Sequence, residues 1–284
     1  MRVKSEPLMN KSILKKIAVF TATVLTGMVF LCGCGGDTSA DEEPGLPSLV
    51  IGSDYYEPYI YLDDNGEFVG MDVQLITEIC KHIGYKAVFK NIEWGMKNEI
   101  LASGEVDALC GCFSVTGRED EYAWTLPYMN SRQVIAVPES SDIYEIADLN
   151  GKRVAVQATT KPDELFSGME SRMKGPVPEL YALNTFPNMS YIFAAIGEGF
   201  VDAIAGHEIA LREYMKSSSV KLRILEEPLL EVQLGIAFGK DTHAEIIEKI
   251  NQTLYLLKHN GFLSELVSSY GLDPDLYLVD YEKN

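Results

Sequence analysis

Two passages of the chain share one design: Leu101-Ala-Ser-Gly-Glu-Val-Asp-Ala-Leu-Cys-Gly111 and Ile196-Gly-Glu-Gly-Phe-Val-Asp-Ala-Ile-Ala-Gly206. Each runs from the end of an expected helix, through a Gly suited to the helix C-cap, into Val-Asp-Ala at the start of an apolar strand. Two copies of one helix-to-strand unit predict an α/β protein of two lobes, each a mixed, mostly parallel sheet flanked by helices. Asp107 and Asp202 stand at the same place in the two copies, and we expect both to bond to nearby backbone.

The residues before the first copy predict further elements of its lobe. Asp63-Asp-Asn-Gly66 is a turn signal, and we expect a hairpin-like excursion around it. Apolar residues from Val73 to Ile83 recur at helical spacing, with Asp72 as the predicted N-cap and Gly84 as the stop.

The chain is expected to cross between the lobes twice. The first crossing is predicted near residues 133–140, and the return crossing near 228–236. Residues 47–135 and 234–284 then form lobe 1, and residues 136–233 form lobe 2.

The N-terminus has the layout of an export signal. Basic residues precede an apolar run from Ile17 to Phe30, which is short for a bilayer span of about 20 residues. Residues 1–33 are therefore predicted to be a signal peptide, with either Met1 or Met9 as the true start.

The apolar run ends in Leu31-Cys32-Gly33-Cys34, which resembles the lipobox of bacterial lipoproteins. The match points to Cys34 as the lipidated residue, with Cys32 as the weaker candidate. Residues 34–46 are then a flexible polar tether that holds the body outside the cytoplasm, anchored to the cell membrane. An ordinary cleaved signal is the alternative.

The composition excludes some partners and cofactors. The formal net charge of −18 argues against nucleic acid, because phosphate binding needs clustered Lys and Arg. Beyond the signal, Cys80, Cys110 and Cys112 have no nearby His or Cys that would complete a metal site. We expect three small buried residues, no metal and no cofactor, with Cys110 and Cys112 facing the same way on a strand from Val106 to Phe113.

The body contains a series of passages that match a known pattern in order and spacing. They are Val69-Gly-Met-Asp-Val-Gln-Leu75, Trp94, Gly104-Glu-Val-Asp-Ala108, Ser114-Val-Thr116, Pro127-Tyr128, Asp148-Leu-Asn-Gly-Lys-Arg-Val154, Gln157-Ala-Thr-Thr160 and Gly235-Ile-Ala-Phe238. With them, residues 49 to 272 resemble the bacterial solute-binding proteins of the polar amino acid ABC uptake systems.

This resemblance implies the two-lobed periplasmic-binding-protein-like fold of type II, with two hinge strands between lobes that close on a ligand. It implies capture of a small solute, a polar amino acid, and its delivery to an ABC transporter permease by a monomeric protein that is not an enzyme. A solute enclosed in a closing cleft loses water, so its polar contacts strengthen.

The resemblance also implies binding residues. Arg118 lies in the loop where the family places its carboxylate-binding Arg, although Thr116-Gly117-Arg118 is one residue shorter than the common spacing. A guanidinium presents a planar fork to a carboxylate. The alternative is a surface Arg that pairs with its acidic neighbours Glu119 or Asp120. Three further matches are Ser114, Gly111, whose carbonyl would face an ammonium group, and Thr160 at a predicted helix start.

The remaining candidates form walls and a charged partner for the ligand. Tyr56 and Trp94 match the family's aromatic walls, and Asp54 could meet a ligand side chain. The family's ammonium-binding Asp is replaced here by His207, followed by Glu208. Either His207 accepts a hydrogen bond while Glu208 supplies the charge, or the ligand is not a standard α-amino acid, or His207 is a core histidine.

Two other classes of function stay open on the sequence alone. One is a dehydratase-like cleft enzyme on the same fold, for which Glu208 is the tempting acid or base. The other is a ligand sensor that serves a membrane receptor. Neither the identity of the ligand nor the resting state of the cleft, open or closed, follows from the sequence.

Overall fold

The computed structural model describes residues 45–173 and 175–281 of the 284-residue chain. The predicted signal peptide, Cys34 and all but the last two residues of the tether lie outside these ranges, so they stay predictions. Within the described ranges, no helix combines the length and the apolarity that crossing a membrane requires.

Lobe 1 is built on a five-stranded sheet in the order β4-β1-β5-β13-β6. The first three strands in this order are parallel, and β13 is antiparallel to both of its neighbours. The strands are β1 (Ser48–Ser53), β4 (Lys86–Asn91), β5 (Ala108–Leu109), β6 (Ala123–Trp124) and β13 (Ala237–Phe238).

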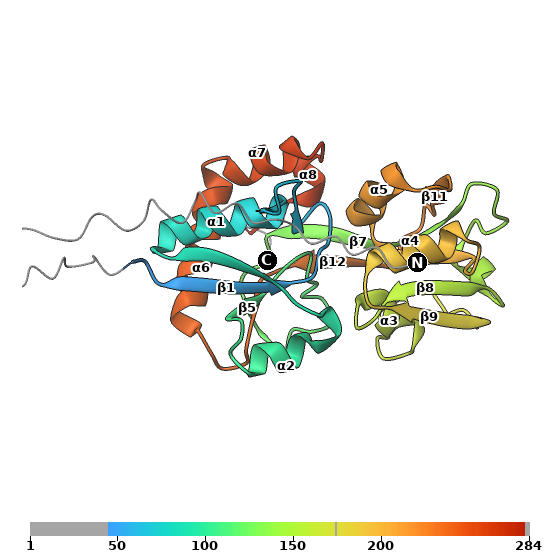
Figure 1. Ribbon diagram of the computed structural model, residues 1–284, viewed down its shortest axis with the longest axis horizontal. Helices are drawn as coiled ribbons and strands as arrows, with labels where there is room; N and C mark the ends of the chain where they lie inside the picture. Colours follow the sequence, from blue (N-terminus) through green and yellow to red (C-terminus); the bar gives the residue numbers. More distant parts are fainter. Residues whose placement is uncertain (1–44, 174, 282–284) are drawn as a thin grey trace, which may run out of the picture. The chain divides into compact units, whose positions relative to one another are not determined.

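Helices cover this sheet because each carries one apolar face. α1, α6 and α7 pack against one another, while α2 covers a separate apolar cluster around Trp94 and Phe113 (Figure 1). The helices of lobe 1 are α1 (Met71–Ile83), the 3₁₀ turn η1 (Trp94–Met96), α2 (Lys97–Ala102), α6 (Ala244–His259), α7 (Phe262–Ser269) and the short α8 (Pro274–Tyr277).

The start of α1 differs from the prediction. Its N-cap is Gly70, and Asp72 lies inside the first turn with a fully buried side chain. Asp72 Oδ2 instead accepts hydrogen bonds from the backbone N–H of Cys112 at 3.0 Å and the hydroxyl of Tyr128 at 2.8 Å. The predicted stop is confirmed, since Gly84 is the C-cap in the left-handed conformation with φ 76°.

Of two further predictions for lobe 1, the hairpin is confirmed and the long strand over Val106–Phe113 is wrong. The hairpin is confirmed as β2 (Tyr61–Leu62) paired with β3 (Phe68–Val69). The strand expected over Val106–Phe113 is only β5, because Gly111 and Cys112 turn the chain with φ values of 97° and 60°. Cys110 and Cys112 therefore do not share a strand face, although these two thiols and Cys80 are buried and free, as expected.

Lobe 2 is built on a six-stranded sheet in the order β11-β7-β10-β8-β9, with β12 also paired to β7. β10, β8 and β9 are parallel, and β7 is antiparallel to β10, β11 and β12. The elements are β7 (Met129–Pro138), η2 (Ile146–Leu149), β8 (Arg153–Gln157), α3 (Lys161–Phe166), β9 (Ala182–Phe186), α4 (Met189–Gly197), β10 (Ala203–His207), α5 (Glu208–Ser217), β11 (Leu222–Ile224) and β12 (Leu230–Leu234).

The paired strands β7 and β12 also connect the two sheets (Figure 1). Their ends reach lobe 1 through two isolated bridges, from Met129 to Leu278 and from Leu234 to Ser114. These strands overlap both predicted crossings, which makes β7 and β12 the natural hinge. The lobe boundaries predicted from the sequence stay predictions.

The two Asp residues of the internal repeat make equivalent hydrogen bonds to backbone, as predicted. Asp107 Oδ2 accepts a hydrogen bond of 2.7 Å from the backbone N–H of Val50, at β1. Asp202 Oδ2 accepts one of 2.8 Å from the backbone N–H of Arg153, at β8. In each lobe the Asp thus fixes the turn between helix and strand to the neighbouring parallel strand.

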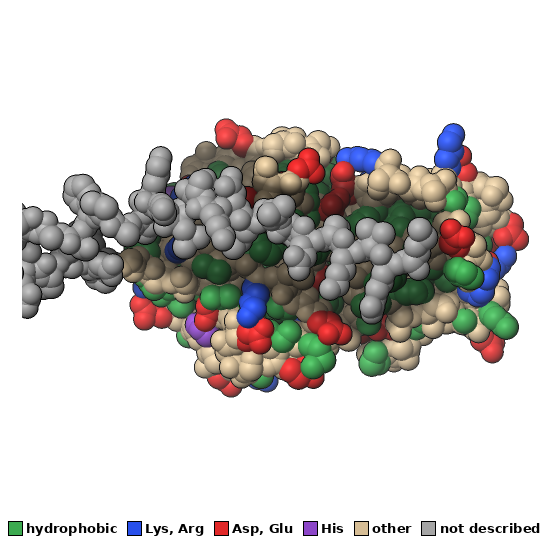
Figure 2. Space-filling view, in the orientation of Figure 1, with side chains coloured by type: hydrophobic (Ala, Val, Ile, Leu, Met, Phe, Trp, Pro, Cys, Tyr) green, Lys and Arg blue, Asp and Glu red, His purple; other side chains and the backbone are tan. Residues whose placement is uncertain are grey.

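The surface reflects the acidic composition. On the face shown in Figure 2, acidic side chains are spread around the described part of the molecule rather than gathered in one patch. No group of three or more His, Cys, Asp or Glu side chains that could hold a metal ion occurs in the described ranges.

Candidate functional site: the cleft between the lobes

Residues of both lobes line a small cavity of about 30 Å³. Eight of the nine ligand-binding residues predicted from the sequence line it. The lining residues are Asp54, Tyr56, Trp94, Gly111, Cys112, Phe113, Ser114 and Arg118 of lobe 1, and Gln157, Thr159, Thr160, Lys161 and His207 of lobe 2.

The lobe 1 wall is formed where loops leave the ends of β1 and β5. A Cβ at Gly111 would lie 2.0 Å from Ser53 Oγ, so only Gly lets the loop after β5 pass this close to the end of β1. Gly111 also has φ 97°, which favours Gly independently. This close approach brings Asp54 and Ser114 to one cavity.

Arg118 is buried in the cleft, so it is not the surface Arg of the alternative interpretation. Its Nη1 donates to the carbonyl of Ser114 at 3.4 Å and its Nη2 to the carbonyl of Thr159 at 3.2 Å. Its guanidinium lies over the Phe113 ring, with Cζ 5.1 Å from the ring centroid. The guanidinium thus contacts both lobes.

The Thr116-Gly117-Arg118 turn lies close to lobe 2. Gly117 has φ 78°, and a Cβ there would lie 2.2 Å from Glu170 Oε2 and 2.6 Å from Lys161 Nζ. The turn therefore packs directly against Lys161 and Glu170 of lobe 2.

Lobe 2 contributes a carboxylate that the sequence analysis missed. Glu164 on α3 forms an ion pair with Arg118, and its Oε2 accepts a hydrogen bond of 2.5 Å from Lys161 Nζ. Glu164 was hidden because the acids in the first turn of α3 are typical of any helix N-terminus. Thr160 is the N-cap residue, but its hydroxyl donates to the carbonyl of Gln157 at 2.6 Å instead of capping the helix.

Asp54 belongs to the lobe 1 wall of the cavity and contacts Gln157 of lobe 2. Burial raises its pKa to about 7, although the hydrogen bond from Gln157 partly opposes the rise. Asp54 is the one acidic residue among the described residues that line this cavity. It can therefore be neutral or charged near physiological pH.

Lys97 is a second residue that the sequence analysis missed. Its side chain is buried, its Nζ lies 5.2 Å from the centroid of the Trp94 ring, and it donates to Thr159 Oγ1 at 2.8 Å. Burial, together with the nearby charge of Arg118, lowers its pKa to about 8. The available signal was its place three residues after Trp94 at a helix start, where the two side chains become neighbours.

His207 stands at the end of β10 inside a hydrogen-bonded frame. Its Nδ1 lies 2.9 Å from Ser131 Oγ and its Nε2 lies 2.8 Å from Gln133 Nε2, both on β7, with Ser114 Oγ 3.4 Å away. Burial, with the charge of Arg118, lowers its pKa to about 3, so the ring is neutral. His207 can exchange a hydrogen bond with a ligand but supplies no charge.

Glu208 is the predicted residue that the structure does not bring to the cavity. Its carboxylate accepts hydrogen bonds from Arg132 at 2.7 Å and from Arg212 at 2.7 Å. Burial alone would raise its pKa, but these two guanidinium groups hold the pKa below its ordinary value. The step from strand to helix at β10–α5 turns consecutive side chains apart, which explains why only His207 faces the cleft.

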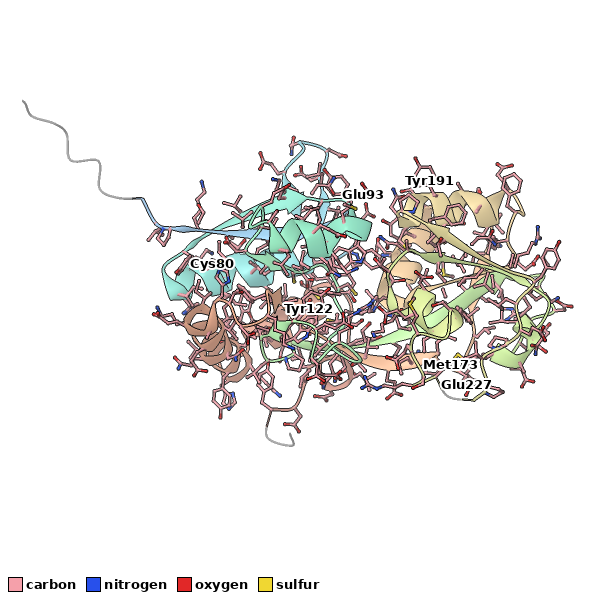
Figure 3. All side chains as sticks on the ribbon, turned by 90° about the horizontal axis from the view of Figure 1, so that it is seen from below. Cys80, Glu93, Tyr122, Met173, Tyr191 and Glu227 are labelled. Atoms are coloured by element: carbon pink, nitrogen blue, oxygen red, sulfur yellow. The ribbon has the colours of Figure 1, made fainter. Side chains whose placement is uncertain are left out.

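Two larger hollows adjoin the site. One, of about 610 Å³, shares Asp54 and Trp94 with the cavity and continues it outward past Glu57, Glu93 and Tyr214. Glu93 lies on the side of lobe 1 that is nearer to lobe 2 (Figure 3). Because it shares two lining residues with the cavity and has residues of both lobes in its lining, this hollow lies beside the cavity in the cleft.

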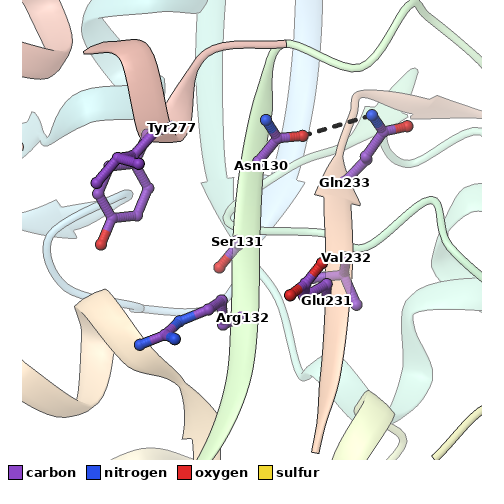
Figure 4. A pocket seen from close by; sticks show the side chains of 8 residues that line it. Asn130, Ser131, Arg132, Glu231, Val232, Gln233 and Tyr277 are labelled. Carbon is purple, nitrogen blue, oxygen red and sulfur yellow. Dashed lines mark hydrogen bonds between the residues drawn. The ribbon is translucent and has the colours of Figure 1, made fainter. Parts of the chain in front are cut away.

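The second hollow lies along the hinge. It has a volume of about 600 Å³ between β7, β12 and α8, with Ser131, Arg132 and Tyr277 among its lining residues (Figure 4). Asn130 and Gln233 are joined across β7 and β12 by a hydrogen bond of 3.4 Å. Ser131 thus lines the hinge groove and also contacts His207 of the cleft.

Two sheets joined by paired hinge strands, with a buried polar cavity between them, define a two-lobed ligand-binding protein of the periplasmic-binding-protein type II fold. The sequence profile of the bacterial extracellular solute-binding proteins, family 3, matches residues 49–273. The chain belongs to this family.

Individual relatives agree with this assignment. The chain is 27% identical over 261 residues to a probable amino-acid-binding protein, YxeM, of Bacillus subtilis, covering 90% of this chain and 95% of the relative. It is 27% identical over 274 residues to the L-cystine-binding protein TcyA of the same organism, covering 91% and 96%. A solved ancestral arginine-binding protein bound to glutamine is 27% identical, with a TM-score of 0.70 over 78% of this chain and 97% of that one.

Proposed function

We propose that this protein captures an amino acid outside the cytoplasm, in the cleft between its lobes, and delivers it to an ABC importer. The observation that carries the proposal is the buried guanidinium of Arg118 in a cavity with walls from both lobes. A buried guanidinium in the cleft can form an ion pair with the carboxylate that every amino acid carries. The named ligands of the relatives support the same class of solute.

The other polar groups follow from the geometry of the cavity. Asp54 pairs with a cationic group of the solute, because Glu208 is held by Arg132 and Arg212. His207, Ser114, Thr160 and the carbonyl of Gly111 exchange hydrogen bonds with it. Tyr56 and Trp94 form its apolar walls. The cavity must open for a solute to enter, and β7 and β12 are the hinge of that motion.

A calorimetric and thermal-shift screen over amino acids, amines and small peptides tests this function. A true ligand raises the melting temperature in proportion to the logarithm of its concentration above Kd. Arg118→Ala removes the response, and Arg118→Lys keeps the charge but loses the two-pronged geometry, so it weakens binding. Arg172→Ala, which removes an exposed cation outside the cavity, is the control. A full response in Arg118→Ala contradicts the assignment.

The rival functions have separate readouts. The protein is a binding protein and not an enzyme, so a bound solute is recovered unchanged after long incubation. Conversion of the solute would favour the dehydratase-like alternative. The importer permease, rather than a receptor, is its membrane partner, so transport assays in vesicles containing the permease respond to the protein.

Membrane attachment is proposed through a lipid on Cys34, followed by the tether at 34–46. Replacement Cys34→Ser releases the protein from membranes into the medium or periplasm, while Cys32→Ser leaves it attached. The opposite pattern would move the lipidated residue to Cys32. We also propose that the protein acts as a monomer, which its sedimentation in solution tests.

A further inference from the structure

Glu164 of lobe 2 and two backbone carbonyls together engage most of the N–H groups of Arg118. Arg118 Nε donates to Glu164 Oε1 at 3.1 Å, and Nη2 contacts the same oxygen. Nη2 also donates to the Thr159 carbonyl, and Nη1 to the Ser114 carbonyl. A guanidinium has five N–H groups. Within the described residues, these contacts leave one N–H on Nη1, which is too few for a bidentate carboxylate.

The Glu164 carboxylate is held in this place from both sides. Its second oxygen, Oε2, accepts the hydrogen bond from Lys161 Nζ, and Lys161 is 1% exposed. Lys161 Nζ also donates a hydrogen bond of 3.4 Å to Oε2 of Glu170. Both cations that touch Glu164 are buried, so water screens these ion pairs poorly.

We propose that Glu164 is a specificity-determining residue: it acts as an internal carboxylate that competes with the solute for Arg118. This rests on the proposed function, in which Arg118 receives the carboxylate of the solute. A solute must then displace Glu164 from Arg118. The free energy that it gains there is only the difference between the interaction of its own carboxylate with Arg118 and that of Glu164. Net affinity has to come from the other walls of the cleft, so a simple monocarboxylate is rejected and a complete amino acid is accepted.

The same contact links the lobes when no solute is bound, because Arg118 belongs to lobe 1 and Glu164 to lobe 2. Glu164 therefore also favours a closed cleft. Stabilising the closed form without solute lowers the apparent affinity for the solute. The reason is that the open form, which can admit a solute, is then only a fraction of the population. Competition at Arg118 and ligand-free closure are two consequences of one ion pair.

The test compares Glu164→Gln with a matched control. Gln keeps the size of the side chain and loses its charge. Glu119→Gln removes a different ion pair between the lobes, with Arg172 at 3.4 Å, whose partners are half-exposed and which does not involve Arg118. Calorimetry uses L-cystine, L-arginine and L-glutamine as probes, with acetate as the simple carboxylate.

We expect Glu164→Gln to bind its amino acid about tenfold more tightly than the wild type, equivalent to a difference near 1.4 kcal/mol, and to begin to bind acetate. Glu119→Gln should stay within about twofold, as expected for an exposed pair. An unchanged or weaker Kd in Glu164→Gln would overturn the proposal, since it would mean that Glu164 orients Arg118 for the solute. Glu164→Asp, which shortens the reach and keeps the charge, should fall between wild type and Gln, and it replaces Gln if that variant does not fold.

A measurement without solute separates this proposal from the proposed function. In small-angle X-ray scattering, Glu164→Gln should have a larger radius of gyration than the wild type and Glu119→Gln, because its lobes open more often. Equal radii would overturn the proposal even if an amino acid binds. If none of the three amino acids bound any variant, the proposed function would lose its support, and scattering would still decide whether Glu164 holds the lobes together.

Discussion

Gln157 of lobe 2 donates a hydrogen bond of 2.5 Å from Nε2 to Oδ2 of Asp54 in lobe 1, so side chains from the two lobes meet inside the cleft. The same Nε2 lies 3.1 Å from the carbonyl of Pro187, which orients the amide. One hydrogen bond does not replace the water that a carboxylate loses on burial. Asp54 is therefore a poorly stabilised anion in this arrangement.

The first prediction concerns stability and pH. The pKa of Asp54 is about 7 in the folded protein against an ordinary value of 3.8, so between these values the folded chain holds a proton that the unfolded chain has lost. Stability from this group therefore falls as pH rises from about 4 to 7. Asp54→Asn removes that slope. The melting temperature of the wild type should drop more between pH 5 and 8 than that of Asp54→Asn, and parallel curves would contradict the prediction.

The second prediction concerns His207, whose pKa is lowered from 6.5 to about 3. The folded chain then binds fewer protons than the unfolded chain, so the stability from this group is complete above pH 6.5 and is lost as pH falls towards 3. Its ring resonances in NMR spectra should not titrate between pH 8 and 4.5. Spectra of His207→Gln identify the signals by their absence. A midpoint near 6.5 would show that the ring is accessible to water.

The third prediction concerns the close approach at Gly117. Gly117→Ala should weaken ligand binding and open the cleft, because the methyl group would meet Glu170 and Lys161 of lobe 2. Gly151→Ala is the control, since Gly151 has a similar φ of 71° and open space around it. Both variants should lose about 1 kcal/mol of stability from the left-handed conformation. Equal ligand affinities in the two variants would count against the contact between turn and lobe 2.

The fourth prediction concerns the repeated Asp. Asp107→Ala and Asp202→Ala should each reduce the free energy of unfolding by about 1–3 kcal/mol, because each leaves a backbone N–H of a neighbouring strand without its acceptor. Asp142→Ala removes only an exposed ion pair with Lys152 and should change stability by less than about 1 kcal/mol. Urea unfolding measures all three. Similar values for the three variants would contradict a structural role of the repeat.

The sequence predicted what depends on local pattern. The repeated Gly and Val-Asp-Ala were enough for two lobes, because helix ends and buried strands have short-range signatures. Eight of the nine candidate residues line one cavity, since the ends of parallel strands gather at one edge of a sheet. The Asp72 N-cap was wrong because Gly70 begins the helix, and tertiary bonds to Cys112 and Tyr128 claim the Asp carboxylate.

What escaped prediction depends on contacts between distant segments. Glu164 and Lys97 become cleft residues only through partners 46 and 62 positions away in the chain. Glu208 was a plausible candidate because it follows His207, but the direction of a side chain at a strand-to-helix junction is set by three-dimensional packing. The pair with Arg212 follows the i,i+4 spacing of a helix, but the contact with Arg132, 76 positions away, does not follow from spacing.

The burial of Cys80, Cys110 and Cys112 has a practical consequence for handling the protein. Thiol-reactive dyes modify exposed thiolates, and burial raises the pKa of all three side chains, so their native reactivity is low. Within residues 45–281, a cysteine introduced at an exposed site such as Met96 or Met169 would therefore react with a fluorophore in preference to the three buried ones. Two such cysteines, one at Met96 in lobe 1 and one at Met169 in lobe 2, would place a dye on each lobe, so that a change in their separation would report solute binding as an optical signal.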